Sequence, residues 1–189
     1  MSKFEKEYRY KITRETLNKI KEVSIVVEHD MQQIDLTLGF NGFDSLRDYG
    51  YICRVREKGN KTWMEIKNKR DKSSFYETEI IITKFSDGVD FFKAIGMKPY
   101  LYMNRKREIL SYKGLKIFID QIELLGDYVE VEVQNLENYE ELLDEFLKLV
   151  NITSEPQPLY GDIFKGILEK DIGFVEVFEK SLSEFLSKS

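Results

Sequence analysis

The chain has 189 residues, of which 33% are charged and 42% hydrophobic, and its formal net charge is −5. This length suits one sizeable domain, and the negative charge argues against nucleic acid or an anionic membrane as a partner. No apolar run reaches bilayer length, and the first residues lack the apolar segment of a signal peptide. The composition therefore predicts a globular protein in the cytoplasm, whose anion-binding sites are local.

The chain has one cysteine and one histidine, which excludes several kinds of metal and disulfide site. Cys53 is the only cysteine, which rules out an internal disulfide and a thiolate zinc cluster. His29 is the only histidine, which rules out a histidine-pair metal site, and it falls in a segment that resembles a solvated loop. Because Cys53 lies on an apolar parity of its segment, we expect a buried thiol without catalytic function.

The order of elements predicts an antiparallel sheet with helices around it. Period-two patterns and turn residues indicate strands at 3–12, 33–38, 50–57, 61–69, 75–83, 101–111, 115–121 and 127–135. Turns are expected at Gly59-Asn60, Lys113-Gly114 and Gly126-Asp127. Helices are expected at 14–23 after the N-cap Thr13, from Asp87-Gly88 to near Gly96, and at 137–150, 159–170 and 173–186. The fold class is therefore α+β, with eight antiparallel strands and peripheral helices.

The strands share an unusual pattern, in which one parity is ionic and the other mainly apolar. In 4–10, for example, Glu5, Glu7 and Arg9 alternate with aromatic residues, and Lys6 is the one exception. Successive strand residues point to opposite faces, so the assembled sheet has one charged face. The same alternation recurs at 53–56, 64–69, 76–80, around Arg105 and Arg107, at 117–120 and at 129–133.

A charged face allows two arrangements. An open sheet with its polar face toward water is ordinary for antiparallel strands. However, like charges two residues apart, such as Arg54 with Arg56 and Glu130 with Glu132, repel each other unless an opposite charge lies between them. A sheet curled around its charges has to be wet and cross-paired, because desolvating more than a dozen ions exceeds a stability of roughly 5–15 kcal/mol. Paired carboxylates then suit Mg²⁺ or Mn²⁺, and paired arginines suit phosphate.

The ordered set of charged motifs resembles the CYTH superfamily, which contains class IV adenylyl cyclases, thiamine triphosphatases and inorganic triphosphatases. Glu5-Lys6-Glu7-Tyr8-Arg9 is similar to the N-terminal E-x-E-x-K signature of that group. The other matches are Arg54-Val55-Arg56, Lys67, Glu77-Thr78-Glu79, Arg105-Lys106-Arg107, Asp120 with Gly126 and Glu130-Val131-Glu132, and Tyr160. The resemblance covers about residues 3–165 of one domain spanning 1–189, with C-terminal helices at 159–188.

The resemblance implies an eight-stranded antiparallel barrel that forms a tunnel, with metal-dependent chemistry on a triphosphate inside it. The implied metal ligands for Mg²⁺ or Mn²⁺ are Glu5, Glu7, Asp120, Glu130 and Glu132. The implied phosphate-binding residues are Arg9, Arg54, Arg56, Lys67, Arg105 and Arg107. Glu5, Glu7, Arg9, Glu130 and Glu132 form the expected catalytic set, and the supporting residues are Glu65, Lys69, Glu77, Glu79 and Tyr160. The partner is a small triphosphate, and a homodimer is left open.

Three positions depart from the family pattern. Arg9 stands where the signature has lysine, and because arginine stays protonated it does not suit a proton relay. Phe75 replaces an arginine before the E-x-E of its strand, which removes one phosphate contact. Leu159 replaces the serine before Tyr160. These changes bear on activity more than on fold.

Four functions fit the residues. The first is hydrolysis of inorganic triphosphate or a small organic triphosphate, which needs the fewest additional groups. The second is a class IV adenylyl cyclase, which also needs a site for base and ribose at the tunnel mouth, where Trp63 is a candidate for stacking. The third is a non-catalytic binding module for polyphosphate or nucleotide, and the fourth is a structural protein with a solvated ionic sheet.

Overall fold

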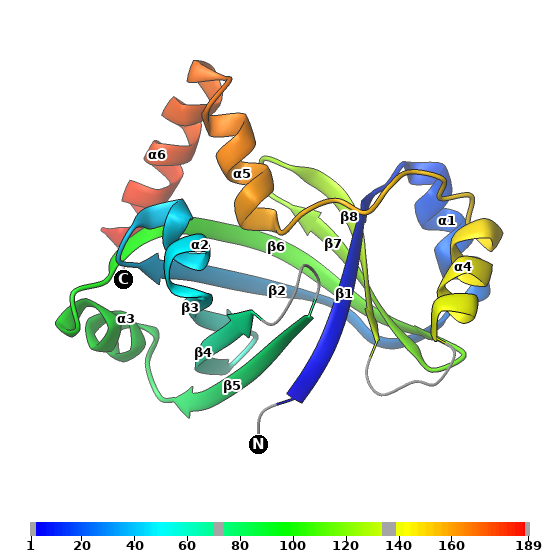
Figure 1. The fold of residues 1–189 in the computed structure, drawn as a ribbon, viewed down its shortest axis with the longest axis horizontal. Coiled ribbons are helices and arrows are strands. Elements are labelled where there is room, and N and C mark those ends of the chain that lie inside the picture. The colour runs from blue at the N-terminus through cyan, green and yellow to red at the C-terminus, as the bar shows by residue number, and fades with distance from the viewer. Residues whose placement is uncertain (1–2, 70–73, 134–138, 188–189) are drawn as a thin grey trace.

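The computed structural model describes residues 3–69, 74–133 and 139–187 (Figure 1). Its strands are β1 (Lys3–Lys11), β2 (Ile25–Gly39), β3 (Tyr51–Lys58), β4 (Lys61–Lys69), β5 (Ser74–Ile82), β6 (Lys98–Tyr112), β7 (Leu115–Ile122) and β8 (Gly126–Val133). Its helices are α1 (Arg14–Val23), the 3₁₀ helix η1 (Gly42–Asp44), α2 (Ser45–Tyr49), α3 (Phe85–Ala94), α4 (Tyr139–Leu149), α5 (Tyr160–Leu168) and α6 (Ile172–Leu186). This is the α+β architecture that the sequence predicts.

The eight strands pair in the order β1-β5-β4-β3-β2-β6-β7-β8, and the two ends of this series meet at β1. Residues 3–6 of β1 pair with β5, and residues 6–11 of the same strand pair with β8, so β1 closes the barrel. Every pairing is antiparallel. Because side chains alternate along each strand, one parity of all eight strands faces the barrel interior.

The apolar parity faces outward and is covered by helices. Side chains of α1 and α4 pack on the outer face of β6, β7, β8 and β1, where Ile20, Leu110, Val131 and Phe146 are fully buried. At the other end of the barrel, α5 and α6 cover a second apolar cluster, and α3 and α6 contribute to a third (Figure 1). The apolar core thus lies between sheet and helices, which leaves the barrel interior to the ionic parity.

The start of α1 illustrates how local sequence sets an element. Thr13 has extended backbone angles, and its hydroxyl oxygen accepts a hydrogen bond from the Thr16 amide at 3.2 Å, which caps the helix. Leu17 and Ile20 then fall on the buried face. The helix runs over 14–23, as the sequence predicts.

Several predicted boundaries were wrong. The strand expected at 33–38 begins at Ile25, so the exposed His29 lies in β2 rather than in a loop. The register of β2 against β6 shifts twice between Val26 and Met31, and these irregularities break the period-two pattern. The turn expected at Gly126-Asp127 lies earlier in the chain. Gly126 is already the first residue of β8, and the tight turn before it contains Leu124 with a φ of 71°.

The helices needed smaller corrections. The sequence predicted neither η1 nor α2, which are three and five residues long. Helix α3 begins at Phe85, two residues before Asp87, where the sequence predicted its start. The expected ends at 134–135 of β8 and at 137–138 of α4 lie outside the described residues. Within the described ranges, no helix combines the length and apolar character that crossing a bilayer requires.

Candidate active site

The inward parity of the strands surrounds a cavity of about 260 Å³. Eleven of the predicted charged residues line it, and they come from β1, β3, β4, β5, β6 and β8. They are Glu7, Arg9, Arg54, Arg56, Lys67, Glu77, Glu79, Arg105, Arg107, Glu130 and Glu132. The predicted charges therefore converge on one enclosed space and do not cover an open sheet.

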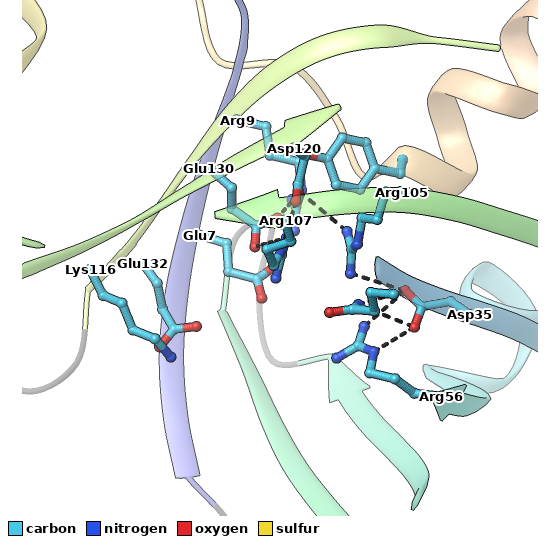
Figure 2. Close-up of polar contacts among 12 residues, drawn as sticks. Glu7, Arg9, Asp35, Arg56, Arg105, Arg107, Lys116, Asp120, Glu130 and Glu132 are labelled. Atoms are coloured by element: carbon cyan, nitrogen blue, oxygen red, sulfur yellow. Dashed lines mark hydrogen bonds and ion pairs between the residues drawn. The ribbon is translucent and has the colours of Figure 1, made fainter. Parts of the chain in front are cut away.

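Three further carboxylates, those of Asp35, Glu65 and Asp120, lie behind this lining, with exposures of 1%, 0% and 0%. Asp35 accepts hydrogen bonds from two nitrogens of Arg56, at 2.5 and 3.0 Å, and from Nη2 of Arg105 at 3.0 Å (Figure 2). Asp35 thus fixes the guanidinium groups of two arginines that come from β3 and β6, the strands on either side of β2. No role was predicted for Asp35 from the sequence.

Asp120 has a similar position on β7. Its oxygens accept from Nε and Nη2 of Arg107, each at 2.6 Å, and from Nη1 of Arg105 at 3.3 Å. The Tyr160 hydroxyl donates to it at 2.9 Å. Although the family resemblance implies a metal ligand here, the structure places Asp120 where it orients the two arginines of β6. Glu65 does the same for β3, through ion pairs with Arg54 and with Arg56 at 3.1 Å.

These buried acids remain ionised. Burial by itself would raise the pKa of Asp120, but Arg107 and Arg105 hold that pKa at about 2. Burial likewise opposes ionisation of Glu65, and Arg54 and Arg56 outweigh it, so its pKa is about 2. The pKa of Asp35 is lowered further, because Arg56 and Arg105 outweigh its burial.

The carboxylates of β1 and β8 form an acidic wall of the cavity. Glu7 pairs with Arg9 and with Nζ of Lys67 at 2.6 Å, and Glu130 pairs with Nε of Arg9 at 2.7 Å. Glu132 lies near the cavity rim, 3.4 Å from Nζ of Lys116 (Figure 2). Lys116 was not predicted as a site residue, although it lies on the same inward parity of β7 as Asp120.

The structure places three further predicted residues in different ways. Glu5 lies in β1 opposite Phe75, and its side chain is outside the described part of the chain. Lys69 is exposed and lines a separate surface pocket with Arg47 and Lys165. Tyr160 is buried and lines the cavity.

The three departures from the family pattern all lie at this cavity. Arg9 is clamped by two glutamates; despite its burial, they raise its pKa, so it stays charged. Phe75 is fully buried, and its ring lies 5.7 Å from Nζ of Lys67. Leu159 lines the cavity beside Tyr160. The site therefore keeps its charge pattern while one wall, at Phe75, is apolar.

One end of the cavity is largely apolar, and the exposed Asp162 is its charged member. Ile52 precedes Arg54 and Arg56 on the inward side of β3, and Phe43, Leu46 and Leu159 line the cavity with it. The Phe43 ring packs edge-on against Tyr100, with the centroids 5.0 Å apart. This end can accept a non-ionic group attached to an anion in the charged part. Trp63 also lines the cavity, but its ring lies 5.8 Å from the Arg56 guanidinium.

The donor set fits a hard divalent cation. Carboxylate oxygens are the ligands that Mg²⁺ and Mn²⁺ prefer, and they are supplied by Glu7, Glu130 and Glu132. A second group, Glu65, Glu77 and Glu79, has carboxylate oxygens within 4.8 Å of one another. The site can thus hold a cation on its acidic side and a polyanion on its basic side.

Glu77 carries a pH dependence that can be measured. Burial and the neighbouring Glu65 raise its pKa from 4.5 to about 7, so folding favours its protonated form. Glu77 should therefore remove on the order of 2 kcal/mol from the stability of the metal-free protein as pH rises from 4.5 through 7, and the loss should level off by about pH 8. Glu77→Gln should remove this loss. Urea denaturation at pH 5, 6, 7 and 8 measures it, and equal slopes in both proteins would contradict the assignment.

The structure defines a class of closed antiparallel barrels that bury their apolar face under helices and enclose a cavity lined by acids and bases. A family model described as the CYTH domain matches residues 3–160. The chain therefore belongs to the CYTH family, and it is an enzyme of this type. A search of curated proteins found no match.

Solved structures share this fold. A conserved hypothetical protein from Pyrococcus furiosus has 24% identity and a TM-score of 0.72, with 84% of this chain and 98% of that chain covered. A proposed adenylate cyclase from Vibrio parahaemolyticus has 17% identity and a TM-score of 0.71, covering 87% and 99%. A proposed adenylyl cyclase from Hippeastrum, described as having a dominant triphosphatase activity, has 17% identity and a TM-score of 0.63, covering 88% and 96%. These likenesses concern the fold.

Proposed function

We propose that this protein hydrolyses a triphosphate, either inorganic triphosphate or a small organic triphosphate, with Mg²⁺ or Mn²⁺. The observation that carries the proposal is the two-sided cavity, in which the carboxylates of β1 and β8 face the cations of β3, β4 and β6. Such a site matches both halves of a metal–triphosphate complex. The triphosphatase activity described for the Hippeastrum relative supports the same reaction class.

The chain's own residues supply binding and orientation. Arg54, Arg56, Arg105 and Arg107 would hold the phosphate chain, because their guanidinium groups line the cavity and are paired with buried acids in the absence of ligand. These arginines also stabilise charge that develops on the phosphoryl oxygens. Glu7, Glu130 and Glu132 would hold Mg²⁺ or Mn²⁺, which supplies polarisation of the attacked phosphorus and a lower pKa for the attacking water.

Arg9 has a positioning role in this scheme. Its side chain joins Glu7 of its own strand to Glu130 of β8, so it holds the two acidic strands in register. Because its pKa is raised, it contacts phosphate as a fixed charge and does not transfer a proton.

A second candidate, adenylyl cyclase, is favoured by the apolar end of the cavity. Phe43, Leu46 and Ile52 give room for a base or ribose beyond the phosphate-binding arginines. In that reaction the ribose 3′-hydroxyl attacks the α-phosphate and pyrophosphate leaves. Hydrolysis remains the first proposal because it requires no further positioned group.

The product formed separates these functions. Purified protein is incubated with inorganic triphosphate, ATP or thiamine triphosphate, in each case with Mg²⁺ or Mn²⁺, and the products are identified by chromatography. Metal-dependent release of phosphate is the expected result. Cyclic AMP with pyrophosphate would establish the cyclase in its place, and an absence of turnover with all three would contradict an enzyme and leave a binding module.

A further inference from the structure

Twelve described side chains of the barrel interior form a closed ring of alternating ion pairs. Each member contacts one opposite charge on either side of it around the ring. In order they are Asp35, Arg56, Glu65, Arg54, Glu77, Lys67, Glu7, Arg9, Glu130, Arg107, Asp120 and Arg105, and Arg105 returns to Asp35. The ring contains six acids and six bases, so its formal charge is zero when Glu77 is ionised.

The ring is continuous because its members come from all eight strands. Two links, those from Glu77 to Arg54 and to Lys67, are 3.6 Å long, and every other link is 3.3 Å or shorter. The side chains are nearly inaccessible, with the largest exposure at 15% for Arg54. A change at one member therefore leaves its two neighbours short of a partner in a poorly solvated place.

A ligand that binds alone, either the cation or the polyphosphate, has to break some of these ion pairs and leave charges unpaired. A divalent cation that takes Glu7 or Glu130 draws these acids away from Arg9, Lys67 and Arg107, and leaves buried cations without full compensation. A polyphosphate that takes the arginines likewise leaves Glu65 or Asp35 undercompensated. When both ligands enter, the cation replaces the arginines at the acids and the phosphates replace the acids at the arginines. The ring thus opens without a net unpaired charge.

We propose that this closed ring makes binding of the divalent cation and of the triphosphate mutually dependent, so that each ligand alone binds weakly. The inference rests on the proposed function for the identity of the two ligands. It adds that Asp35 and Glu65, which do not line the cavity, set this dependence by holding the arginines in the absence of ligand.

The test measures each ligand by itself, because triphosphate chelates divalent cations in solution. Calorimetry at pH 8 in EDTA gives the affinity for metal-free inorganic triphosphate. Glu65→Gln removes one acid from the ring and frees Arg54 and Arg56, so the affinity should rise at least about tenfold. Glu77→Gln, at the weakest links of the ring, should act in the same direction and serves as the second variant if Glu65→Gln does not fold.

The matched control is Glu79→Gln. Glu79 lies on the same inward side of β5 and lines the same cavity, but it is not a member of the ring. The substitution changes the charge of the cavity by the same amount as Glu65→Gln. A general electrostatic effect would raise the affinity for triphosphate in both variants, although less for Glu79, whose side chain is exposed, than for the buried Glu65. The ring predicts a change of less than about threefold for Glu79→Gln.

The reciprocal experiment uses Mn²⁺ without any polyphosphate, followed by electron paramagnetic resonance. Lys67→Gln releases Glu7 from one of its partners. Mn²⁺ should therefore bind to this variant at least about tenfold more tightly than it binds to the wild type. Lys58→Gln is the control, because Lys58 lines the cavity while its amine pairs with Glu28 at 2.7 Å, outside the ring. The Lys58→Gln affinity should match that of the wild type.

The outcomes separate this inference from the proposed function. If the wild type binds triphosphate with metal present, and ring and control variants respond alike, the ring has no such role while the proposed function stands. If neither the wild type nor any variant binds triphosphate with or without metal, the proposed function fails and the inference with it. If the ring variants bind triphosphate or Mn²⁺ more tightly than the wild type and the control variants do not, the mutual dependence is established.

Discussion

Glu132→Gln is expected to lower metal-dependent turnover by about 10³-fold and to leave the melting temperature unchanged or slightly raised. Glu132 lines the cavity near its rim, and the contact described for it is a 3.4 Å pair with the half-exposed Lys116. Unlike the carboxylates of Asp120 and Glu65, it lines the cavity together with Glu7 and Glu130, and it belongs to the set proposed to hold the cation. Removing its charge also relieves repulsion from Glu130 in the metal-free protein.

The measurement is a phosphate-release assay with a thermal melt of the same preparation. Glu123→Gln, which neutralises an exposed carboxylate in the turn between β7 and β8, is the control and should retain full activity. The same loss of turnover is expected for Glu5→Gln, whose side chain lies outside the described residues. Full activity in Glu132→Gln would refute the metal-binding role of the β8 acids.

Asp120→Asn is expected to destabilise the metal-free protein by about 3 kcal/mol, measured by urea denaturation. Asp120 is fully buried and pairs with Arg105 and Arg107, so the substitution leaves two buried guanidinium groups without this anion. The free energy of unfolding should fall in the absence of any ligand, because the pairs are made within the chain. Metal-free triphosphate should bind more tightly to this variant, as for Glu65→Gln, because Arg105 and Arg107 lose an anionic partner in the ring.

The contrast with Glu132→Gln tests the two roles against each other. Both substitutions remove one carboxylate charge from the barrel interior, but only Asp120 braces two arginines behind the cavity lining. If the stability of metal-free Asp120→Asn equalled that of the wild type, while its metal affinity fell, Asp120 would be a metal ligand as the family resemblance implies.

The period-two pattern was sufficient to predict which faces of the strands meet. Arg54 and Arg56, Arg105 and Arg107, and the acids of β8 all lie inward, because each belongs to a regular strand with apolar residues on the other parity. Register cannot be read from such a pattern, so the pairing of Arg107 with Asp120 across β6 and β7 was not predictable.

Asp35 and the 3₁₀ helix η1 show where sequence reasoning fails. The inward neighbours of Asp35 are Gln33 and Thr37, which are uncharged, so β2 lacked the ionic signature of the other strands. Its partners lie 21 and 70 residues away in the chain, and only the closed barrel brings them together. Residues 42–44 are too short for a helical period, yet Phe43 shapes the apolar end of the cavity.

We propose that the inward acids and bases form one site that holds a cation and a triphosphate together. A crystal of the protein grown with Mn²⁺ and a non-hydrolysable triphosphate, examined by anomalous scattering, tests it most directly. We expect an Mn²⁺ peak within bonding distance of Glu130 or Glu132, and phosphate oxygens on the arginines of β3 and β6. An ordered ligand seated outside the barrel, with the twelve ion pairs unchanged, would contradict the account.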